Sequence, residues 1–525
     1  MRRHALSWAY LALLAGGLHF LLTASFGLSR HWGYLSSIHD LGVFDQAVWG
    51  TLHGAPFLNT SNVFGLPINW LGFHFNPILI VFAPFYLVYP AAEWLILAQA
   101  AAVSITAWPL YLLGREVLRS ERAAFLWAAA YLVNPFVLNA AVWDFHPVAL
   151  AAPLMAVNVL AIEKRKAGLF GLGCAMLLLV QEHFGASVAG FAILWWLRNR
   201  TLAPAAIAFS MGVAHTILVL GVIMPGLSPT GSHVMMSGDL GQLSRYAWLG
   251  GSAGEIVHAL VDNPVAILEK ALFDMGGAAY LAFLLVPLLA MPLVGIEFLL
   301  PALADLSANL LSANPMPRSM LSYHSISLMP LLMAAGIVGS ARVVTFWRKR
   351  SSDIVSMMVL IIGLLLGYFA APLPFPHAYS TWQPRAWHLA RDSRVSEVRR
   401  LLTPEASVSA QANVAAHFSQ RERIYAFPAR LGEADFIVLR LESPTRRPEG
   451  QDPGRVGSLA HHLGMPTKQY LSSVGRLLDD GAYGVALWNP PWLIFSKGEA
   501  TSERAERLVR AQLANLEQEW NGSNR

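Results

Sequence analysis

Residues 6–28 have the sequence LSWAYLALLAGGLHFLLTASFGL and contain no Asp, Glu, Lys or Arg. A helix of about 20 apolar residues is long enough to cross the ~30 Å hydrocarbon core of a bilayer. The chain turns aromatic and polar after Leu28 without a small-residue cleavage motif. We therefore predict a retained first membrane span and not a signal peptide.

Composition extends this prediction to most of the chain. Hydrophobic residues make up 55% of the 525 residues, charged residues make up 13%, and the mean hydropathy is +0.47. These values predict an α-helical polytopic membrane protein and not a soluble globular one. The net charge of +5 comes from short Lys and Arg clusters between apolar stretches, which is typical of membrane topology and not of nucleic-acid binding. The single cysteine, Cys174, lies in an apolar stretch and is expected to pack there.

Hydropathy predicts about eleven transmembrane helices within a membrane domain of residues 1–371. Their expected ranges are 6–28, 92–113, 122–140, 147–162, 168–181, 184–197, 202–224, 277–291, 293–311, 325–346 and 354–371. The apolar segment 77–89 is too short to cross comfortably and precedes Pro90. We expect a re-entrant or interfacial helix there.

The distribution of positive charge predicts the orientation of these spans. If the spans alternate, five basic clusters fall on one side, which should be the cytoplasm. The clusters are Arg2 and Arg3; Arg115, Arg119 and Arg122; Lys164 to Lys166; Arg198 and Arg200; and Arg348 to Arg350. We therefore expect a multi-pass protein of the cell inner (plasma) membrane, with a cytoplasmic N-terminus. The first outer loop, residues 29–76, then faces the periplasm or the outside.

The last third of the chain is predicted to be a different domain. Residues 372–390 begin with a proline-punctuated stretch that cannot continue a helix and indicates a linker. Residues 391–525 then predict a small soluble α/β domain outside the membrane, because an odd number of spans precedes it. Its expected elements are helices at 393–402 and 501–519, strands at 424–427 and 435–439, and a hairpin at 484–495 with a proline-bearing turn.

The first outer loop contains two carboxylates in the sequence SIHDLGVFDQ, residues 37–46. An ionisable residue close to the hydrocarbon is costly and is a functional-site hypothesis by default. Asp45 follows Asp40 by five residues, about 140° around a helix, so the two need not share a face. For Asp45, helix capping or pairing with Arg30 is an equally weighted structural alternative.

Further polar motifs fall on the same predicted membrane face. They are Phe73-His74-Phe75-Asn76-Pro77, Trp143-Asp144-Phe145-His146-Pro147, Gln181-Glu182-His183-Phe184 and the stretch from Arg318 to His324. Helices packed as a bundle could bring these groups into one site. The second motif could equally turn the chain between two spans, since Pro147 suits the first turn of a helix. Glu182 and His183 interrupt apolar sequence, which favours a role in lining a site.

The order of these motifs resembles a bacterial and archaeal membrane protein family known as domain of unknown function 2079. The resemblance covers roughly residues 6–440. It rests on Asp40-Leu41-Gly42-Val43-Phe44-Asp45-Gln46-Ala47-Val48-Trp49 with Gly54, on His74-Phe75-Asn76-Pro77, on Asp144-Phe145-His146-Pro147, on Glu182-His183 and on Ser322-Tyr323-His324. The chain departs from the family at Gln181-Glu182-His183, where members often carry Lys-Glu-Asp.

That family is in turn similar to the GT-C glycosyltransferases. The resemblance implies a GT-C-like polytopic fold with an acidic residue and interfacial helices in the first outer loop and an outer C-terminal domain. It also implies an inverting transfer of sugar from a polyprenyl-phosphate donor in the bilayer to a glycan, lipid or protein acceptor.

Residue roles follow from the chemistry of this transfer. A hydroxyl that attacks an anomeric carbon must lose a proton, which calls for a carboxylate base. Asp40 is expected to be this base, because its place in Asp40-Leu41-Gly42-Val43-Phe44 resembles the acidic-residue, glycine and aromatic pattern of the first outer loop in GT-C enzymes. Asp45 is the second catalytic candidate, which could orient the acceptor or, like Asp40, bind a divalent cation such as Mg²⁺ or Mn²⁺. The leaving phosphate needs fixed donors. The predicted substrate-binding residues are His39, Gln46, His74, Asp144, His146, Glu182, His183, Arg318, Tyr323 and His324.

Two other classes of function stay open from the sequence. A transporter or lipid flippase would use carboxylates and histidines as an ion relay, but such a relay should cross the bilayer. Here the polar residues gather at one predicted face. A non-catalytic membrane scaffold would present only the C-terminal domain. No nucleic-acid partner is expected.

Overall fold

A computed structural model of the chain describes residues 7–62, 66–232, 242–347, 351–370, 392–442 and 462–522. The predicted linker 372–390 lies outside these ranges. The chain divides into two compact units. Unit 1 comprises Met1–Gly27, Leu71–Ile78 and Ile96–Gln383, and unit 2 comprises Leu28–Trp70, Leu79–Leu95 and Pro384–Arg525.

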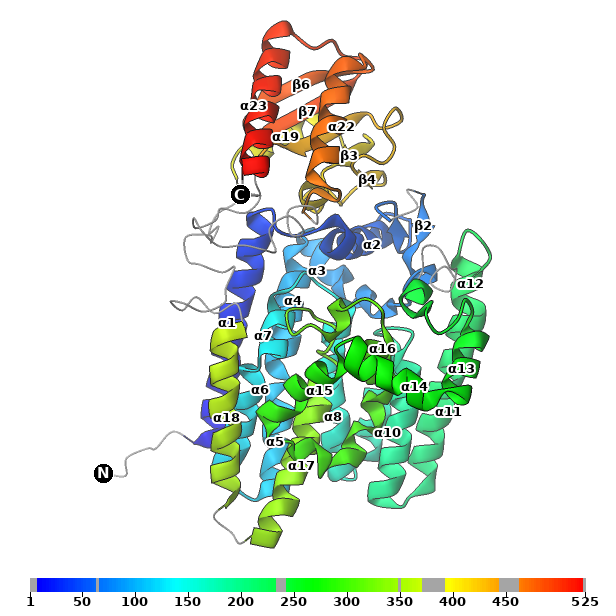
Figure 1. Ribbon diagram of the computed structural model, residues 1–525, viewed down its shortest axis with the longest axis vertical. Helices are drawn as coiled ribbons and strands as arrows, with labels where there is room; N and C mark the ends of the chain where they lie inside the picture. The colour runs from blue at the N-terminus through cyan, green and yellow to red at the C-terminus, as the bar shows by residue number, and fades with distance from the viewer. Residues whose placement is uncertain are drawn as a thin grey trace, which may run out of the picture. The chain divides into compact units, whose positions relative to one another are not determined.

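Unit 1 is a bundle of helices. Several of them, including α5, α6, α8, α10, α11, α17 and α18, run side by side, while α14 and α16 lie across them (Figure 1). The helices in chain order are α1 (Trp8–Trp32), α4 (Glu93–Ile105), α5 (Ala107–Leu118), α6 (Glu121–Leu132), α7 (Pro135–Val142), α8 (Ala151–Glu163), α9 (Ala167–Leu178), α10 (Phe184–Asn199), α11 (Leu202–Leu218), α12 (Met224–Leu227), α13 (Ala253–Asp262), α14 (Pro264–Glu269), α15 (Gly277–Leu285), α16 (Leu303–Leu311), α17 (Met329–Trp347) and α18 (Ser351–Ala370). The first part of α1 and the last part of α4 belong to this unit.

Four helical segments in the described residues are long and apolar enough to cross a membrane. They are Trp8–Trp32, Glu93–Leu118, Leu202–Leu227 and Ser352–Ala370. The number rises to six if the bent pairs Glu121–Leu132 with Pro135–Val142 and Pro264–Asp274 with Gly277–Leu288 each count as one span. The expected eleven spans are therefore not confirmed. Helices such as α8 and α9 do form where spans were predicted, but they are shorter than the ~20 residues that a full crossing needs.

Close helix contacts in unit 1 depend on glycine. A Cβ added to Gly190 in α10 would lie 2.6 Å from the carbonyl oxygen of Leu300, and one added to Gly336 in α17 would lie 2.7 Å from the Trp127 ring. Small residues are typical of helix interfaces in membranes because they let backbones approach.

Unit 2 contains a five-stranded mixed sheet with the order β4-β3-β5-β7-β6. Its strands are β3 (Val408–Ala410), β4 (Ile424–Ala426), β5 (Phe436–Arg440), β6 (Tyr483–Asn489) and β7 (Trp492–Lys497). Strand β3 pairs in parallel with β4 and β5, whereas β7 pairs antiparallel with β5 and β6. The remaining elements are α2 (Val43–Leu52), α3 (Ala83–Val88), α19 (Val395–Leu401), α20 (Ala412–Ala415), α22 (Thr467–Asp479), α23 (Glu503–Gly522) and the short pair β1 (Leu58–Asn59) and β2 (Ile68–Asn69).

The two faces of this sheet carry separate cores. Ile437 and Leu439 point to the face covered by α22 and α23, whereas Val438 points to the opposite face. On that opposite face, Tyr34 and Ile38 of the first outer loop pack with residues of α19 and α20. The alternation is the expected period of two along a strand. The first outer loop therefore supplies part of the core of the C-terminal α/β fold.

The local predictions for this domain are mostly confirmed. The hairpin forms as β6 and β7, the two predicted strands form as β4 and β5, and the two predicted helices form as α19 and α23. Strand β3 and helix α22 were not predicted. The short apolar segment after Asn76 folds as a 3₁₀ turn, Pro77–Phe82, followed by α3, which together are too short to cross a bilayer.

Candidate functional site

The first-loop motif begins with a π-helical turn, Ile38–Gly42, which runs directly into α2. The Ser37 hydroxyl caps this turn by accepting a hydrogen bond from the backbone N–H of His39 at 3.1 Å. Gly42 lets the turn approach its neighbours, because an added Cβ would lie 2.6 Å from the Ile38 side chain. Asp40 is half-buried and His39 is exposed on this turn. Single π-helical turns are frequent at functional sites.

Asp45 differs sharply from Asp40, because its side chain is only 1% exposed. Its Oδ1 accepts hydrogen bonds from the Tyr86 hydroxyl at 2.7 Å and from the Gln420 amide at 3.0 Å. Its Oδ2 accepts one from the Ser419 hydroxyl at 2.6 Å. Burial raises the pKa of Asp45 above its ordinary value, and the three hydrogen bonds only partly oppose that effect. Within the described residues these are its partners, and Arg30 is not among them.

Gln46 is fully buried and also contacts the C-terminal part of unit 2. Its side-chain amide donates to the Thr60 hydroxyl at 2.8 Å and to the carbonyl of Arg421 at 2.9 Å. The Thr60 hydroxyl in turn bonds the backbone of Ile424 at the start of edge strand β4. Asp45 and Gln46 therefore hold residues 419–424 against the first outer loop.

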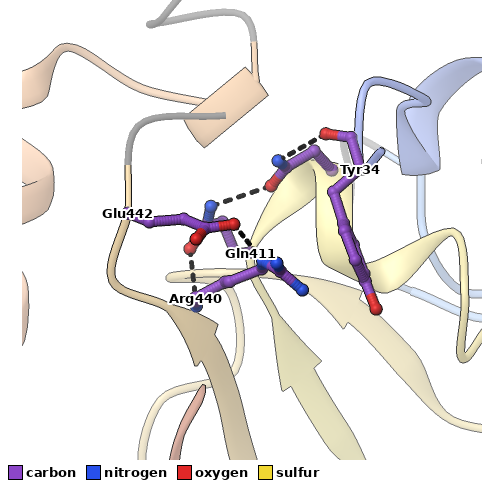
Figure 2. A pocket seen from close by; sticks show the side chains of 5 residues that line it. Tyr34, Gln411, Arg440 and Glu442 are labelled. Atoms are coloured by element: carbon purple, nitrogen blue, oxygen red, sulfur yellow. Dashed lines mark hydrogen bonds and ion pairs between the residues drawn. The ribbon is translucent and has the colours of Figure 1, made fainter. Parts of the chain in front are cut away.

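A second contact region within unit 2 surrounds a shallow hollow lined by Tyr34, Gln411, Asn413, Arg440 and Glu442 (Figure 2). The Arg440 guanidinium lies 3.9 Å from the centre of the Tyr34 ring and pairs with Glu442 at 2.5 Å. The Asn413 amide donates to the Tyr34 carbonyl at 2.8 Å. Because these groups bind one another, they hold the first outer loop against the C-terminal part of unit 2.

Unit 1 contains the other predicted site residues, beginning with His74 and Glu182. His74 Nδ1 lies 2.8 Å from Glu182 Oε1, and the backbone N–H of Phe75 donates to Oε2 at 2.9 Å. Burial alone would raise the pKa of Glu182, but the charge and hydrogen bond of His74, helped by His183, lower it to about 2. Glu182 is thus a carboxylate with both oxygens engaged.

His183 pairs with a carboxylate that the sequence analysis did not select. Its Nε2 lies 3.4 Å from Asp305 Oδ1, and the Ser327 hydroxyl donates to Asp305 Oδ2 at 2.6 Å. Asp305 was included in a predicted span, residues 293–311. An ionisable residue inside an apolar stretch is itself a signal of a functional site, and that signal could have found it.

Three aromatic rings of unit 1 stack on one another. The His146 and Tyr323 rings are stacked with centroids 3.6 Å apart, and Tyr323 stacks on His324 at 4.2 Å. His146 is positioned through its backbone N–H, which donates to Gln99 at 2.8 Å. The Gln99 amide also bonds the carbonyl of Trp143 at 2.7 Å.

Arg318 and Asp144 occupy more enclosed positions in unit 1. Arg318 is 9% exposed, and its Nη1 donates to the carbonyls of Asn309 and Ser312 at the C-terminal end of α16. A cation there is favoured by the helix dipole. Asp144 is 5% exposed, and its carbonyl accepts a weak contact from the Gln99 amide at 3.4 Å.

Unit 1 therefore connects predicted residues from four separate segments. His74 bonds Glu182, His183 follows Glu182 and pairs with Asp305, and Asp305 bonds Ser327. Ser327 lies three residues after His324, which stacks on Tyr323 beside His146. We use the name imidazole cluster for two groups of side chains taken together: His74 and His183, which contact carboxylates, and the ring stack of His146, Tyr323 and His324.

A family model described as "Predicted membrane protein (DUF2079)" matches residues 30–449. The chain belongs to this family. The DUF2079 match contains every predicted site residue from His39 to His324 and extends through strand β5.

Comparison with other proteins adds little to the family assignment. No curated protein matches the DUF2079 chain. Among solved structures, ArnT from Cupriavidus metallidurans, described as bound to undecaprenyl phosphate, has a TM-score of 0.49 and 11% sequence identity. The alignment covers 93% of this chain and 98% of the ArnT chain. A TM-score below 0.5 is too low to assign a fold or an activity.

Metal binding was considered at Asp40 or Asp45 from the sequence. In the described ranges, no group of three or more His, Cys, Asp or Glu side chains could hold a metal ion. The oxygens of Asp45 accept from three uncharged side chains, which is the pattern of a buried structural carboxylate.

The Glu182→Gln variant is expected to lower stability at neutral pH by about 3 kcal/mol, because Glu182 titrates at about 2 instead of 4.5. A depressed carboxyl pKa stabilises the folded state above the ordinary pKa, and this stability is lost as the pH falls through the folded value. The difference in melting temperature between wild type and variant should therefore shrink between pH 4.5 and pH 2. Thermal unfolding in nanodiscs across this range would measure it.

Asp262→Asn is a suitable control for that measurement, because Asp262 is 48% exposed and pairs with His258, which is 79% exposed. Its effect on melting should be small at neutral pH. A constant difference between wild type and Glu182→Gln at every pH would contradict the assignment of Glu182.

Proposed function

We propose that this DUF2079 protein is a membrane glycosyltransferase of the GT-C type. It would move a sugar, with inversion, from a polyprenyl-phosphate donor to an acceptor at the outer face of the inner (plasma) membrane. The N-terminus would be cytoplasmic and the C-terminal α/β domain periplasmic or extracellular, as the basic clusters favour. The acceptor class, whether glycan, lipid or protein, is left open by this proposal.

The observation that carries the proposal is the imidazole cluster of unit 1. Each imidazole and the Tyr323 hydroxyl can donate a hydrogen bond to a phosphate oxygen. Donors held in place before the bond breaks stabilise the charge that develops on a leaving phosphate. The contacts of Glu182 and Asp305 fix two of these imidazoles in advance.

Asp40 is assigned as the general base of this reaction. It is half-buried on a π-helical turn, whereas Asp45 is enclosed by three hydrogen-bond donors. A base must reach the hydroxyl proton of its acceptor, which favours the more accessible carboxylate. We assign Asp45 and Gln46 to holding the loop, because both side chains bind residues 419–424.

The proposal is tested with the full-length protein in nanodiscs and a panel of polyprenyl-phosphate sugars. Release of polyprenyl phosphate is the readout, because it is common to every acceptor, including water. At least one donor should release the lipid phosphate in a protein-dependent manner. Absence of release and of donor binding across the panel would overturn the proposal.

The bent helix pairs keep a transporter as a second candidate. The pairs bend by 52° after Leu132 and by 73° after Asp274, and broken helices are typical of transporter binding sites. Transporter activity would move an intact labelled lipid or solute across a liposome membrane without chemical change. Product analysis in the same liposomes distinguishes the two functions.

A further inference from the structure

We propose that His183, positioned by Asp305, is the proton donor to the polyprenyl phosphate as it leaves the sugar. This inference rests on the proposed glycosyltransferase function and adds Asp305 to its machinery as a positioning residue. It is carried by the difference between the two neighbouring imidazole–carboxylate pairs of unit 1.

In the first of these pairs, the carboxylate of Glu182 is committed to the fold. Glu182 Oε1 binds His74 Nδ1 at 2.8 Å, and Oε2 accepts from the backbone of Phe75 at 2.9 Å. The carboxylate is 13% exposed. Glu182 therefore fixes residues 74 and 75 and has little capacity left for a ligand.

The second pair is open on its imidazole side. Asp305 is 11% exposed and is held by the Ser327 hydroxyl, whereas His183 is 34% exposed. His183 Nε2 faces Asp305, and across the described residues its Nδ1 has no hydrogen-bond partner. A buried carboxylate that orients one nitrogen and leaves the other for a ligand is the arrangement of a general acid or base.

The proposed proton transfer balances with the glycosyl transfer. As the acceptor oxygen bonds to the anomeric carbon, the bond from that carbon to the phosphate oxygen breaks, and its electron pair stays on the phosphate. The acceptor proton goes to the general base of the reaction, and the His183 imidazolium gives a proton to the phosphate oxygen. Neutral His183 then regains a proton from water, and the base releases its proton to water.

The chemistry of the two groups suits this step. Imidazole ordinarily titrates near pH 6.5, and the second ionisation of a phosphate monoester lies near 6. Transfer between groups of similar acidity needs little driving force. The nearby carboxylate of Asp305 stabilises the imidazolium form before the transfer.

Other titratable groups face His183 and must be separated from it in any experiment. Glu182 and His215 of α11 both interact electrostatically with His183, His74 bonds Glu182, and Asp305 comes from α16. Asp305→Asn, a conservative change in α16, separates the pair with Asp305 from these other groups. It should alter phosphate binding by His183 only if that pair positions the imidazole.

The test measures how a polyprenyl phosphate binds to the full-length protein in phosphatidylcholine nanodiscs between pH 5.5 and 8.5. Wild type should bind more weakly as the pH rises. Part of this pH dependence comes from the ionisation of the lipid phosphate itself. His183→Gln should remove the remaining part. Asp305→Asn should weaken binding about tenfold at pH 7, because the imidazolium that holds the phosphate loses its neighbouring negative charge.

His258→Gln is the matched control, because His258 also pairs with an aspartate in unit 1 but is 79% exposed. Its binding curve should match that of wild type. Melting temperatures identify any variant that fails to fold. If His183→Gln does not fold, Asp305→Asn still tests the role of the pair, because its side chain can still accept from Ser327.

Each outcome separates the two proposals. If wild type binds no polyprenyl phosphate at any pH, the proposed function fails and takes the assignment of His183 with it. If wild type binds but His183→Gln keeps the full pH dependence, or Asp305→Asn binds like wild type, the role of the His183–Asp305 pair is overturned while the proposed function stands.

Discussion

Asp40→Asn is expected to lower the rate of sugar transfer by a factor of about 10² to 10⁴, the usual contribution of a positioned general base. The amide keeps the size and polarity of the carboxylate but cannot accept the acceptor proton at neutral pH. Asp40 is half-buried on the turn that precedes α2, and the capping bond from Ser37 to His39 does not involve its side chain. The melting temperature, measured beside the rate, identifies any part of the effect that acts through folding.

The measurement is polyprenyl-phosphate release with whichever donor is active for wild type. Asp40→Glu should recover part of the rate, since it restores a base at a shifted position. His53→Gln is a useful control from the same loop, because His53 is exposed at the end of α2 and has no proposed role in the site. Full activity of a folded Asp40→Asn protein would exclude Asp40 as the base and favour the scaffold or transporter alternatives.

Asp45→Ala should destabilise unit 2 by about 4 kcal/mol. The change leaves three buried donors, on Tyr86, Ser419 and Gln420, without their acceptor. Each unsatisfied buried donor typically costs about 1–3 kcal/mol. Residues 416–424 should then exchange amide hydrogen faster, because they lose their contact with the first outer loop.

Asp45→Asn is expected to be much milder and to reveal the charge state of Asp45. The Asn oxygen can still accept from Tyr86 and Gln420, and the Ser419 hydroxyl can accept from the new amide while donating to the Ala416 carbonyl. A carboxyl pKa raised by burial gives stability that is present at low pH and is lost as the pH rises through the raised value. Relative to wild type, the Asn variant should therefore gain stability as the pH rises.

Melting temperatures and hydrogen exchange together decide this prediction. Asp479→Ala is the matched control within unit 2, because Asp479 is 65% exposed and pairs with Arg510 at the surface. Its effect should stay within about 0.5 kcal/mol. Equal melting of wild type and Asp45→Ala, with unchanged exchange in residues 416–424, would show that Asp45 does not hold the loop.

The two aspartates of the first loop show where sequence reasoning reached its limit. The motif identified both residues, and the helical angle between them indicated that they need not share a face. Neither observation could tell which carboxylate is enclosed, because the groups that enclose Asp45 come from residues 86, 419 and 420. Hydrophobic periodicity reports which face of an element is buried, but not which distant element covers it.

Asp305 was missed, and the expected eleven spans are not confirmed, for a related reason. Asp305 lies in an apolar stretch that was counted as a span, and its partners His183 and Ser327 are remote in sequence or lie in another element. A hydropathy window averages over about nineteen residues, so it merges short broken helices into apparent crossings. The predicted span 122–140, for example, covers Glu121–Leu132 and Pro135–Val142, which are bent by 52° relative to each other.

The sequence by itself determined the membrane class, the family, the hairpin and flanking helices of the C-terminal domain, and the polar motifs from which a site could be built. These depend on composition, local periodicity and short motifs, which the chain carries whatever its tertiary contacts. Only the tertiary structure decided that Asp45 and Gln46 hold residues 419–424, that the first outer loop enters the core of the α/β fold, and that His183 pairs with Asp305. Those outcomes depend on the burial and hydrogen bonding of groups far apart in the chain, and the free energy of such contacts is set by packing that no local pattern encodes.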